Sequence, residues 1–508
     1  MLYKIITVKT MHYTIIAILF STGLTTSYAI LRSPNKLNLH IICNSAIRNQ
    51  IQSYKNYAIL GQSTPIGRSS SNLYKNTAGF LHPLNQKHIH PNTHVLIIAG
   101  GGMEENTLWP TTEYLANHFY YMLIRRYFTH EQITYISDHS YNYDFGGDGI
   151  AEIIVDDHDP SATDIQNYLE SFYLNHEIPI LNEKSRLIIY FTDHGGQGII
   201  KIGKGKYLSA DDFDEWLDEL QAATHCQVAV IIEACYSGTF IKPLRPDSNQ
   251  QRVLISSSNT DVSLDDETGA KSFSQFLFNH IFKGESLKKS FDDAYSELKT
   301  YVLFTFQSPL LIDGQNGEYA ANFYIAGSFK KKDAFPEILE TTPHTNIDAG
   351  LFTLFARATD LEGQIRVWAN VIKPDVVIPK TLSDFITPVI DSERIPLPQT
   401  NEPDLFQGEY NFQCNGTHLI TFFAKDSMGD IVSEEIQIDV KNGIDCMADI
   451  NNDLTINLYD AITLLNVCSH MAYSYSSINV FGSNVNHDGY LGLEEVIYVM
   501  QKIAKMKE

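Results

Sequence analysis

Five short, continuously apolar runs alternate with helix-length segments between residues 94 and 303. The runs begin at residues 94, 132, 187, 228 and 252 and read HVLIIA, QITYIS, LIIYFT, VAVIIE and RVLISS. The amphipathic segments, which we expect to be helical, span 111–126, 162–174, 209–222 and 271–303. Strands that are apolar along their whole length belong to sheets that are covered on both faces. The pattern therefore predicts an α/β domain over residues 93–329, with a mainly parallel sheet flanked by helices.

Charge and cysteine content narrow the range of functions. The 508-residue chain has 37 Lys and Arg against 60 Asp and Glu, a net charge of −23. Such a surface repels phosphate backbones and anionic membranes, so we expect no nucleic-acid partner. The six cysteines are too few and too scattered for a disulfide framework or a CxxC zinc site. The pairing of any disulfide stays open among five of them: Cys43, Cys226, Cys414, Cys446 and Cys468.

The first 29 residues have the layout of an export signal. Lys4 and Lys9 precede an uncharged run over 13–29, which ends in Ser27-Tyr28-Ala29, with small residues where a signal peptidase cleaves. A buried helix or a membrane anchor is the alternative, although the run is short and rich in Ser and Thr. Since no later run approaches about 18 apolar residues, we expect a secreted or cell-surface chain without a transmembrane anchor in its mature form.

Three further regions surround the α/β domain. Residues 30–92 are rich in Ser and Asn and resemble short strands and turns. Residues 330–444 contain alternating strand-like runs that begin at 352, 364, 418 and 435, which predicts a small β-sandwich, immunoglobulin-like in type. Residues 445–508 contain two acidic, Asn-rich loops, each followed by an amphipathic helix.

The apolar runs at 187 and 228 both end in residues suited to nucleophilic catalysis. The first leads into Asp193-His194-Gly195-Gly196 and the second into Glu233-Ala234-Cys235. The carboxyl ends of parallel strands collect catalytic groups at one edge of a sheet. A cysteine nucleophile needs an imidazole that accepts its proton, and the developing oxyanion needs a fixed donor such as the N–H of Gly195. We therefore predict that His194, Cys235 and Gly195 are catalytic.

Two acidic residues adjoin this pair. Glu233 precedes Cys235 by two residues, so it lies on the same side of the strand and is a candidate for the substrate pocket; the alternative is pairing with a structural cation. Asp193 is assigned to the pocket region as well, where it orients His194 or has a structural role in the turn.

The sequences YFTDHGGQG and VIIEACYSG resemble the two active-site signatures of the legumain-type cysteine peptidases, in the caspase-like clan. The resemblance covers roughly residues 94–327. It implies a caspase-like fold, with His194 as catalytic histidine, Cys235 as nucleophile, Gly195 at the oxyanion and Glu233 in the pocket. Plant and animal legumains carry an Arg-His pair after the first strand, where this chain has Gly100 to Glu105. Acidic residues after the fifth strand, with Glu233, instead suggest a pocket for Lys or Arg: Asp261, Asp265, Asp266 and Glu267.

The two C-terminal loops place oxygen-bearing residues at calcium-ligand spacing, positions 1, 3, 5, 7, 9 and 12. The first loop supplies Asp449, Asn451, Asp453, Thr455, Asn457 and Asp460, and the second supplies Asn484, Asn486, Asp488, Tyr490 and Glu495. Position 6 of the first loop is Leu454 rather than Gly. The arrangement is similar to dockerin modules, which implies structural calcium and a cohesin-like partner on a scaffold protein. The apolar stripes of the two helices are alternatively the core of the module.

Together these features predict a secreted cysteine endopeptidase that hydrolyses peptide bonds through a Cys-His pair and an acyl-enzyme, with a protein or peptide substrate and no catalytic cofactor. Two alternatives remain open. One is a non-catalytic scaffold protein that binds calcium and a cohesin-like partner, and the other is a peptide transamidase.

Overall fold

The computed structural model divides into two compact units, Met1–His88 and Ile89–Glu508. The described residues of the second unit are 92–101, 108–137, 152–157, 160–174, 180–247, 250–266, 269–325, 327, 335–360, 365–374, 392–427, 429–451, 453, 455–469, 485 and 492–504. Elsewhere only the backbone of assigned strands is described.

The first unit contains antiparallel strands. Strands β1 (Lys4–Thr10), β2 (Tyr13–Leu19) and β3 (Ile30–Arg32) form one sheet. Two hairpins follow, β4 (Ile47–Ile51) with β5 (Tyr54–Ala58) and β6 (Gly67–Ser70) with β7 (Lys75–Ala78). The expected export signal lies here, where no side chain is described, and it stays a prediction.

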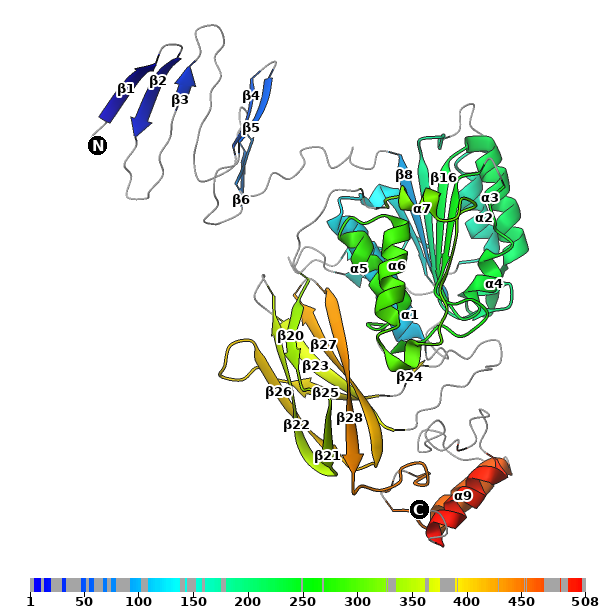
Figure 1. The fold of residues 1–508 in the computed structure, drawn as a ribbon. Helices are drawn as coiled ribbons and strands as arrows, with labels where there is room; N and C mark the ends of the chain where they lie inside the picture. Colours follow the sequence, from blue (N-terminus) through cyan, green and yellow to red (C-terminus); the bar gives the residue numbers. More distant parts are fainter. Residues whose placement is uncertain are drawn as a thin grey trace. The chain divides into compact units, whose positions relative to one another are not determined.

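A sheet of six strands forms the centre of the α/β region in the second unit; its strands β8 and β16 are labelled in Figure 1. Its order is β19-β17-β16-β12-β8-β9. The five parallel strands coincide with the five apolar runs of the sequence, and only β19 is antiparallel to its neighbour β17. The predicted mixed α/β architecture is confirmed and is compatible with a caspase-like fold. The strands are β8 (Thr93–Ala99), β9 (Ile133–Ser137), β12 (Arg186–Thr192), β16 (Gln227–Glu233), β17 (Arg252–Ser256) and β19 (Leu310–Ile312).

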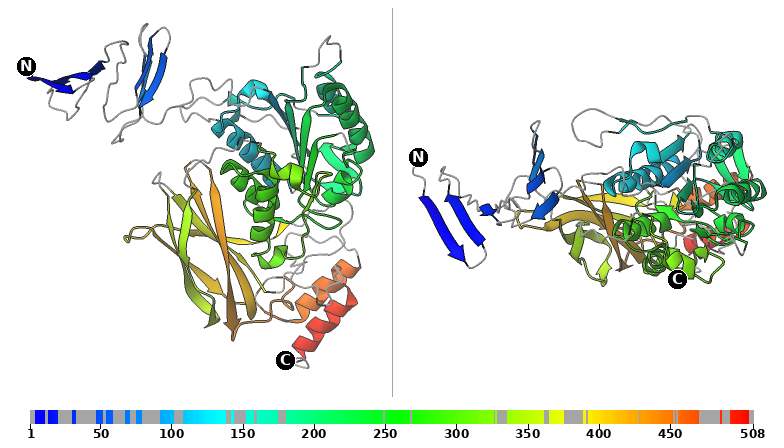
Figure 2. Two further views of the ribbon diagram at one scale, coloured as in Figure 1. Left: turned by 45° about the horizontal axis from the view of Figure 1, so that its top comes forward. Right: turned by 90° about the horizontal axis from the view of Figure 1, so that it is seen from above.

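Helices cover both faces of this sheet, and each face has its own core (Figures 1 and 2). Successive residues of β8 alternate between the two cores: Val95 and Ile97 face one, Leu96 and Ile98 the other. This explains why the strands are apolar throughout. The first core includes α1 (Trp109–Arg125), α5 (Phe273–Phe282) and α6 (Leu287–Leu298), and the second includes α2 (Ala162–Glu170) and α3 (Ala210–Thr224).

The segment 271–303, predicted as one helix, forms two. Helix α5 ends at Phe282, and Gly284 follows with φ of 89°, a left-handed conformation that glycine adopts without a steric penalty. Ser286 then caps α6 by accepting a hydrogen bond from the N–H of Lys289. The single-helix prediction was wrong because a glycine inside an apolar periodicity does not by itself mark a break.

Short elements complete this part of the chain. A three-stranded sheet of β13 (Gly195–Gly196), β14 (Ile199–Gly203) and β15 (Lys206–Ser209) follows β12 directly. Strand β18 (Asp265–Asp266) pairs in parallel with β24 (Val389–Ile390). The remaining elements are β10 (Asn142–Tyr143), β11 (Glu152–Ile153), α4 (Ser237–Ile241), α7 (Glu318–Ala321) and the 3-10 turns His130–Gln132 and Val302–Phe304.

Two sheets follow and share one apolar core. The three-stranded sheet has the order β20-β22-β26 and the five-stranded sheet the order β21-β28-β27-β23-β25. The runs predicted from 352, 364, 418 and 435 are all strands. The bounds are β20 (Glu337–Thr341), β21 (Thr345–Asp348), β22 (Gly350–Thr359), β23 (Ile365–Ile372), β25 (Glu393–Leu397), β26 (Leu405–Phe412), β27 (Gly416–Asp426) and β28 (Ile431–Lys441).

The other face of the five-stranded sheet packs against the α/β region. Trp368 and Phe423 stack with ring centroids 5.1 Å apart, and with Ile431 they bury Ala270 of the α/β region. Lys271 Nζ lies 3.0 Å from Glu435 Oε2, with both side chains almost fully buried. The five-stranded sheet is therefore covered on both faces.

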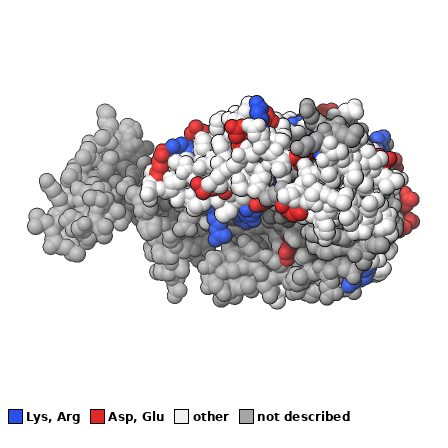
Figure 3. Space-filling view, turned by 90° about the horizontal axis from the view of Figure 1, so that it is seen from below, with Lys and Arg blue, Asp and Glu red and all other residues white. Residues whose placement is uncertain are grey.

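The C-terminal helices α8 (Leu458–Cys468) and α9 (Leu493–Ile503) pack on each other around a small apolar core. A disulfide between Cys414 and Cys446 ties the residues before α8 to the end of β26, a pairing that the sequence left open. On the face in Figure 3, Lys and Arg side chains are interspersed with Asp and Glu. Among the described helices, none has the length and apolar character that a bilayer crossing requires.

Candidate active site

His194 and Cys235 occupy matching positions at the ends of two neighbouring strands. Thr192 of β12 pairs with Glu233 of β16, and each of the two candidate catalytic residues follows that pair by two positions. The two segments are in direct contact, because a Cβ atom added to Gly195 would lie 2.1 Å from the carbonyl oxygen of Cys235. Parallel register thus brings the predicted histidine, glycine and cysteine to one edge of the sheet.

Cys235 lies in a sharp turn from strand to helix. The residue after it, Tyr236, has φ of 54°, which is uncommon for a residue with a side chain. Its N–H donates to the carbonyl of Asp261 at 2.8 Å, which holds the turn against the loop after β17. The Cys235 thiol lies 3.8 Å from the carbonyl oxygen of Ser263, and the residue is only 4% exposed. The turn thereby holds the sulfur in one place.

The surroundings of His194 favour a neutral imidazole. Burial lowers the pKa of His194 most, the charge of Asp193 opposes this, and the charge of Lys201 adds to the lowering. The net direction is below 6.5. A neutral imidazole at neutral pH is the form that can accept a proton from a thiol.

Asp193 is buried and contacts three residues around the histidine turn. Its carboxylate accepts hydrogen bonds from the Thr112 hydroxyl at 3.2 Å and from the His194 N–H at 2.6 Å. Lys201 Nζ lies 3.8 Å from the same carboxylate. Asp193 therefore links α1 and β14 to the histidine turn, while its predicted place in a substrate pocket stays a prediction.

Glu233 is also buried, with 3% of its surface exposed. One carboxylate oxygen accepts the Ser263 hydroxyl, and the other accepts the N–H of Ser274, in the first turn of α5, at 2.6 Å. Burial raises the pKa of Glu233, and these hydrogen bonds oppose the rise. Glu233 thus joins the strand that carries Cys235 to the loop after β17 and to α5.

Both active-site signatures lie inside a single matched segment. Residues 174–301 match the Peptidase C13 family. The match includes His194, Gly195, Glu233 and Cys235.

Curated relatives carry names that agree with the Peptidase C13 match. A vacuolar-processing enzyme of Vicia sativa is 39% identical over 62 residues, which cover 12% of this chain and 13% of that protein. The vacuolar-processing enzyme beta-isozyme 1 of Oryza sativa subsp. indica is 30% identical over 16% of each chain. A vacuolar-processing enzyme of Glycine max is 34% identical over 13% of this chain and 14% of that protein. The family match and these relatives support a legumain-type cysteine peptidase.

The solved structures that align do so weakly. The N-terminal Ig1-2 module of the Drosophila receptor protein tyrosine phosphatase DLAR covers 21% of this chain at 15% identity, with a TM-score of 0.15. CopC of Methylosinus trichosporium OB3b covers 22% at 12% identity, with a TM-score of 0.16. Neither score bears on the fold.

Buried serines in the loop after β17, which the sequence did not single out, make hydrogen bonds to the segment that carries Cys235. Ser258 donates its hydroxyl to the carbonyl of Ala234 at 3.0 Å and also accepts from the N–H of Ser237. The hydroxyl of Ser257 accepts from the N–H of Ala234 at 3.2 Å. The run Ser256-Ser257-Ser258 after an apolar strand was the available signal, but serines in a loop are usually solvated.

The acidic residues predicted to line the pocket differ in how deeply they are buried. Asp265 is buried, whereas Asp261 is half-buried and its carboxylate accepts the N–H of Asn259 at 2.7 Å. The side chains of Asp266 and Glu267, and residues 102–105 where legumains carry the Arg-His pair, lie outside the described residues.

In the first acidic loop, the candidate calcium ligands make hydrogen bonds to the backbone of the loop itself. Asp460 accepts the N–H groups of Ile450 and Asn457, both at 2.9 Å, and Asp449 accepts the N–H of Asp453 at 3.1 Å. In the second loop, Asn484, Asn486, Asp488 and Tyr490 lie outside the described residues. Glu495 is buried, and one of its carboxylate oxygens accepts the N–H of Gly492 at 2.6 Å.

Proposed function

We propose that this chain is a cysteine endopeptidase whose nucleophile is Cys235 and whose general base is His194. The observation that carries the proposal is the placement of both residues two positions beyond the paired Thr192 and Glu233, with Gly195 packed on the Cys235 carbonyl. The match of residues 174–301 to the Peptidase C13 family supports the same reaction type.

The proposed reaction has two halves. The imidazole of His194 takes the thiol proton, and the Cys235 sulfur attacks the peptide carbonyl carbon. The carbonyl oxygen becomes an oxyanion, which the N–H groups of Gly195 and Cys235 stabilise. Collapse of the tetrahedral intermediate breaks the C–N bond, and the protonated His194 gives its proton to the leaving amine. Water, activated by the neutral imidazole, then attacks the acyl-enzyme and releases the acid and the thiol.

We propose that the site prefers a basic residue, rather than asparagine, before the scissile bond. Glu233 has no Lys, Arg or His partner among its described contacts, and Asp265 is buried as well. Burial raises the pKa of the Tyr190 phenol most, and the charges of Glu233 and Asp265 add to the rise. An acidic pocket of this kind attracts Lys or Arg side chains.

The C-terminal residues are proposed to form a dockerin-like calcium module. In the first loop, the side-chain oxygens at positions 1, 3, 5 and 12 accept hydrogen bonds from N–H groups of the loop backbone; these positions are Asp449, Asn451, Asp453 and Asp460. Oxygen-bearing side chains at this spacing suit Ca²⁺. In the second loop, Oε1 of Glu495 is buried without a hydrogen bond, as expected of a ligand oxygen. Calcium would hold the loops against α8 and α9 and would take no part in catalysis.

The helix pair has both buried and exposed apolar residues. The core of the module contains Ala461, Leu464, Val496 and Val499. In addition, each helix has exposed apolar residues at helical spacing: Leu458, Tyr459, Ile462 and Leu465 on α8, and Leu493, Ile497 and Met500 on α9. Exposed apolar residues on both helices favour a protein partner, which we propose to be cohesin-like, on a scaffold at the cell surface. Export through residues 1–29 and an immunoglobulin-like sandwich over 330–444 belong to the same proposal.

The test compares the full chain with its Cys235→Ala variant against a mixed peptide library, with calcium or with chelator, and identifies cut sites by mass spectrometry. Cuts made by the parent alone, enriched in Lys or Arg before the cut, support the proposal. Ligated products formed with an added amine would instead indicate a transamidase. Equal absence of cuts in both, with retained binding to a partner, would favour the scaffold function.

A further inference from the structure

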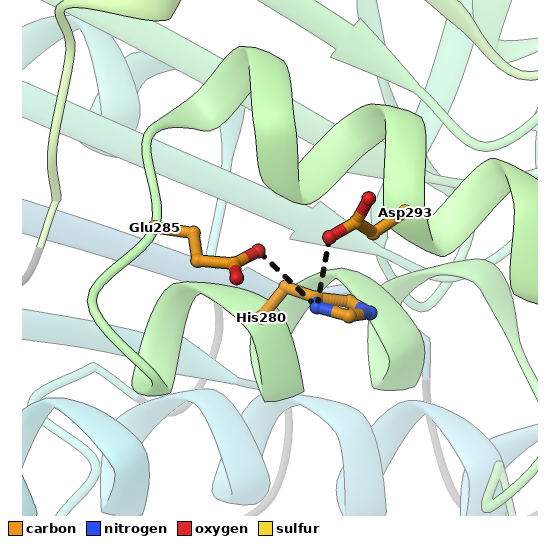
Figure 4. A group of neighbouring side chains, drawn as sticks. All are labelled: His280, Glu285 and Asp293. Carbon is orange, nitrogen blue, oxygen red and sulfur yellow. Dashed lines mark ion pairs between the residues drawn. The ribbon is translucent and has the colours of Figure 1, made fainter. Parts of the chain in front are cut away.

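A histidine and three carboxylates meet where α5 turns into α6, away from the residues of the proposed active site. His280 lies in the last turn of α5, Glu285 in the connection, and Asp293 and Glu297 on α6. Nδ1 of His280 lies 3.3 Å from Glu285 Oε2 and 3.6 Å from Asp293 Oδ2 (Figure 4). One potential ligand atom from each of these three residues lies within 4.8 Å of the others.

These separations match those of ligands around one small metal ion. Zinc binds histidine nitrogen and carboxylate oxygen at about 2.0 Å, usually with tetrahedral geometry. Two such ligands at a tetrahedral angle lie about 3.3 Å apart. The separations of His280 Nδ1 from the two carboxylate oxygens are close to that value. Calcium, with ligands at about 2.4 Å and six or more oxygens, would require a wider and richer set.

Two of the three ligand atoms are buried without a hydrogen bond. Nδ1 of His280 and Oε2 of Glu285 are shielded from solvent; among the described residues they make no hydrogen bond, and their contacts are the ion pairs within this cluster. A buried polar atom that loses water without gaining a hydrogen bond costs free energy. A metal ion between the two atoms would satisfy both at once.

The remaining ring nitrogen of His280 faces a carboxylate that can orient it. Nε2 lies 3.4 Å from Glu297 Oε2. Metal-binding histidines commonly donate the N–H of their other ring nitrogen to a carboxylate, which fixes the tautomer and the ring orientation. With the proton on Nε2, the lone pair of Nδ1 is directed at Glu285 and Asp293.

One cation already approaches the cluster. Lys289 Nζ pairs with Asp293 and lies 3.8 Å from Glu285 Oε2. Its side chain is 56% exposed, so it can turn into solvent. One lysine leaves the three carboxylates of the cluster incompletely neutralised, and a divalent ion would displace it from Glu285 and Asp293.

We propose that His280, Glu285 and Asp293 bind a divalent transition-metal ion, with Zn²⁺ the best fit, and that Glu297 orients the histidine. The site joins the end of α5 to α6. The first turn of α5 holds Glu233 through the N–H of Ser274, so the ion braces the helix pair that borders the proposed active site. The inference does not depend on peptidase activity.

The test titrates Zn²⁺ into the full-length, untagged Cys235→Ala chain by calorimetry, in saturating calcium so that the active-site thiol and the C-terminal loops do not compete. Co²⁺ is then added separately, and its visible spectrum reports the coordination geometry. We expect one Zn²⁺ per chain, an intense tetrahedral Co²⁺ spectrum and a higher melting temperature with Zn²⁺. His280→Gln and Asp293→Asn should lose at least 100-fold in affinity.

Two milder variants change the affinity in opposite directions and leave the ligands in place. Glu297→Gln should weaken Zn²⁺ binding by about 10- to 100-fold, as for other residues that orient a metal ligand. Lys289→Met should strengthen it, because a competing cation is removed. Circular dichroism of each variant without metal establishes that the fold is retained.

Matched controls separate a built site from general acidity. His225→Asn removes an exposed imidazole outside the cluster, and Asp292→Asn removes the exposed carboxylate beside Asp293. Both should bind Zn²⁺ as the parent does. The proposal would be overturned if the parent bound no Zn²⁺, if Asp292→Asn lost as much affinity as Asp293→Asn, or if Glu297→Gln and Lys289→Met left the affinity unchanged.

Discussion

Gly195 lies directly against the carbonyl group of Cys235. A Cβ atom at Gly195 would come within 2.1 Å of the Cys235 oxygen and 3.0 Å of the Cβ atom of Ala234. At both distances the neighbouring atom would have to move to make room for the Cβ atom. The absence of a side chain at Gly195 is therefore what allows the turn that carries His194 to rest on the turn that carries Cys235.

Gly195→Ala should separate these two turns. We expect kcat/KM to fall by about 100-fold or more, because a shift of about 1 Å between catalytic groups has effects of that size. Stability should fall by about 1–3 kcal/mol from overpacking. Gly198→Asn is the control, since Gly198 has φ of 69° and no atom near its missing Cβ, and asparagine tolerates that conformation. Normal activity of Gly195→Ala would contradict the contact.

The pH dependence of kcat/KM reports the state of His194. Because burial, aided by Lys201, holds the pKa of His194 below 6.5, the acid limb of the profile should fall below pH 6.5. Lys201→Met removes a lowering charge, so the limb should move to higher pH. Lys204→Met, an exposed change on the same hairpin, should leave it in place. A limb that stays fixed in Lys201→Met would show that another group controls it.

His118 should make the fold sensitive to acid. It is buried against Tyr114, and burial lowers the pKa of His118 to about 4. In the unfolded chain this imidazole takes up a proton near pH 6.5, whereas in the folded chain it does so only near pH 4. The free energy of unfolding should therefore be highest above pH 6.5 and should decrease as the pH falls toward 4. The loss should approach about 3 kcal/mol. His118→Phe should show a smaller decrease in urea titrations at pH 7 and pH 4.5; an unchanged decrease would contradict this assignment.

The buried pair Lys271–Glu435 should couple the α/β region to the five-stranded sheet. Lys271 also donates to Thr421 at 3.0 Å. Glu435→Gln leaves a buried ammonium without its counter-charge and should cost about 3–5 kcal/mol. The double variant Lys271→Met, Glu435→Leu should cost much less than the sum of Lys271→Met and Glu435→Leu made singly. The exposed Lys288–Asp292 pair, removed in the same way, should cost at most about 1 kcal/mol. Additive effects at Lys271 and Glu435 would exclude coupling.

The strands of the six-stranded sheet were predictable, because a strand that is buried on both faces appears in the sequence as a continuous apolar run. Every residue of β8 from Val95 to Ala99 belongs to one of the two cores, so the run is apolar throughout. The placement of His194 and Cys235 at one edge of the sheet followed from the same rule, because parallel strands in register end at one edge. Local pattern and sheet geometry were sufficient to predict this placement.

Contacts across long stretches of sequence were not predictable. Glu233 was assigned to a pocket, and the structure shows its carboxylate bonded to Ser263 and Ser274, 30 and 41 residues further along the chain. No periodicity marks these serines. Likewise, the break between α5 and α6 depends on the left-handed Gly284, and the Cys414–Cys446 pairing depends on how β26 approaches the C-terminal residues.

The most direct test of the proposed chemistry is to trap the acyl-enzyme. The chain is mixed with an activated ester of a Lys-containing peptide, quenched in acid within seconds and measured by intact-mass spectrometry, and the modified residue is mapped by proteolysis. We predict a mass increase of one acyl group on Cys235, slower formation in His194→Ala and no adduct in Cys235→Ala. Peptide cleavage by Cys235→Ala, or an adduct on another residue in the parent chain, would contradict the assignment of Cys235 as the nucleophile.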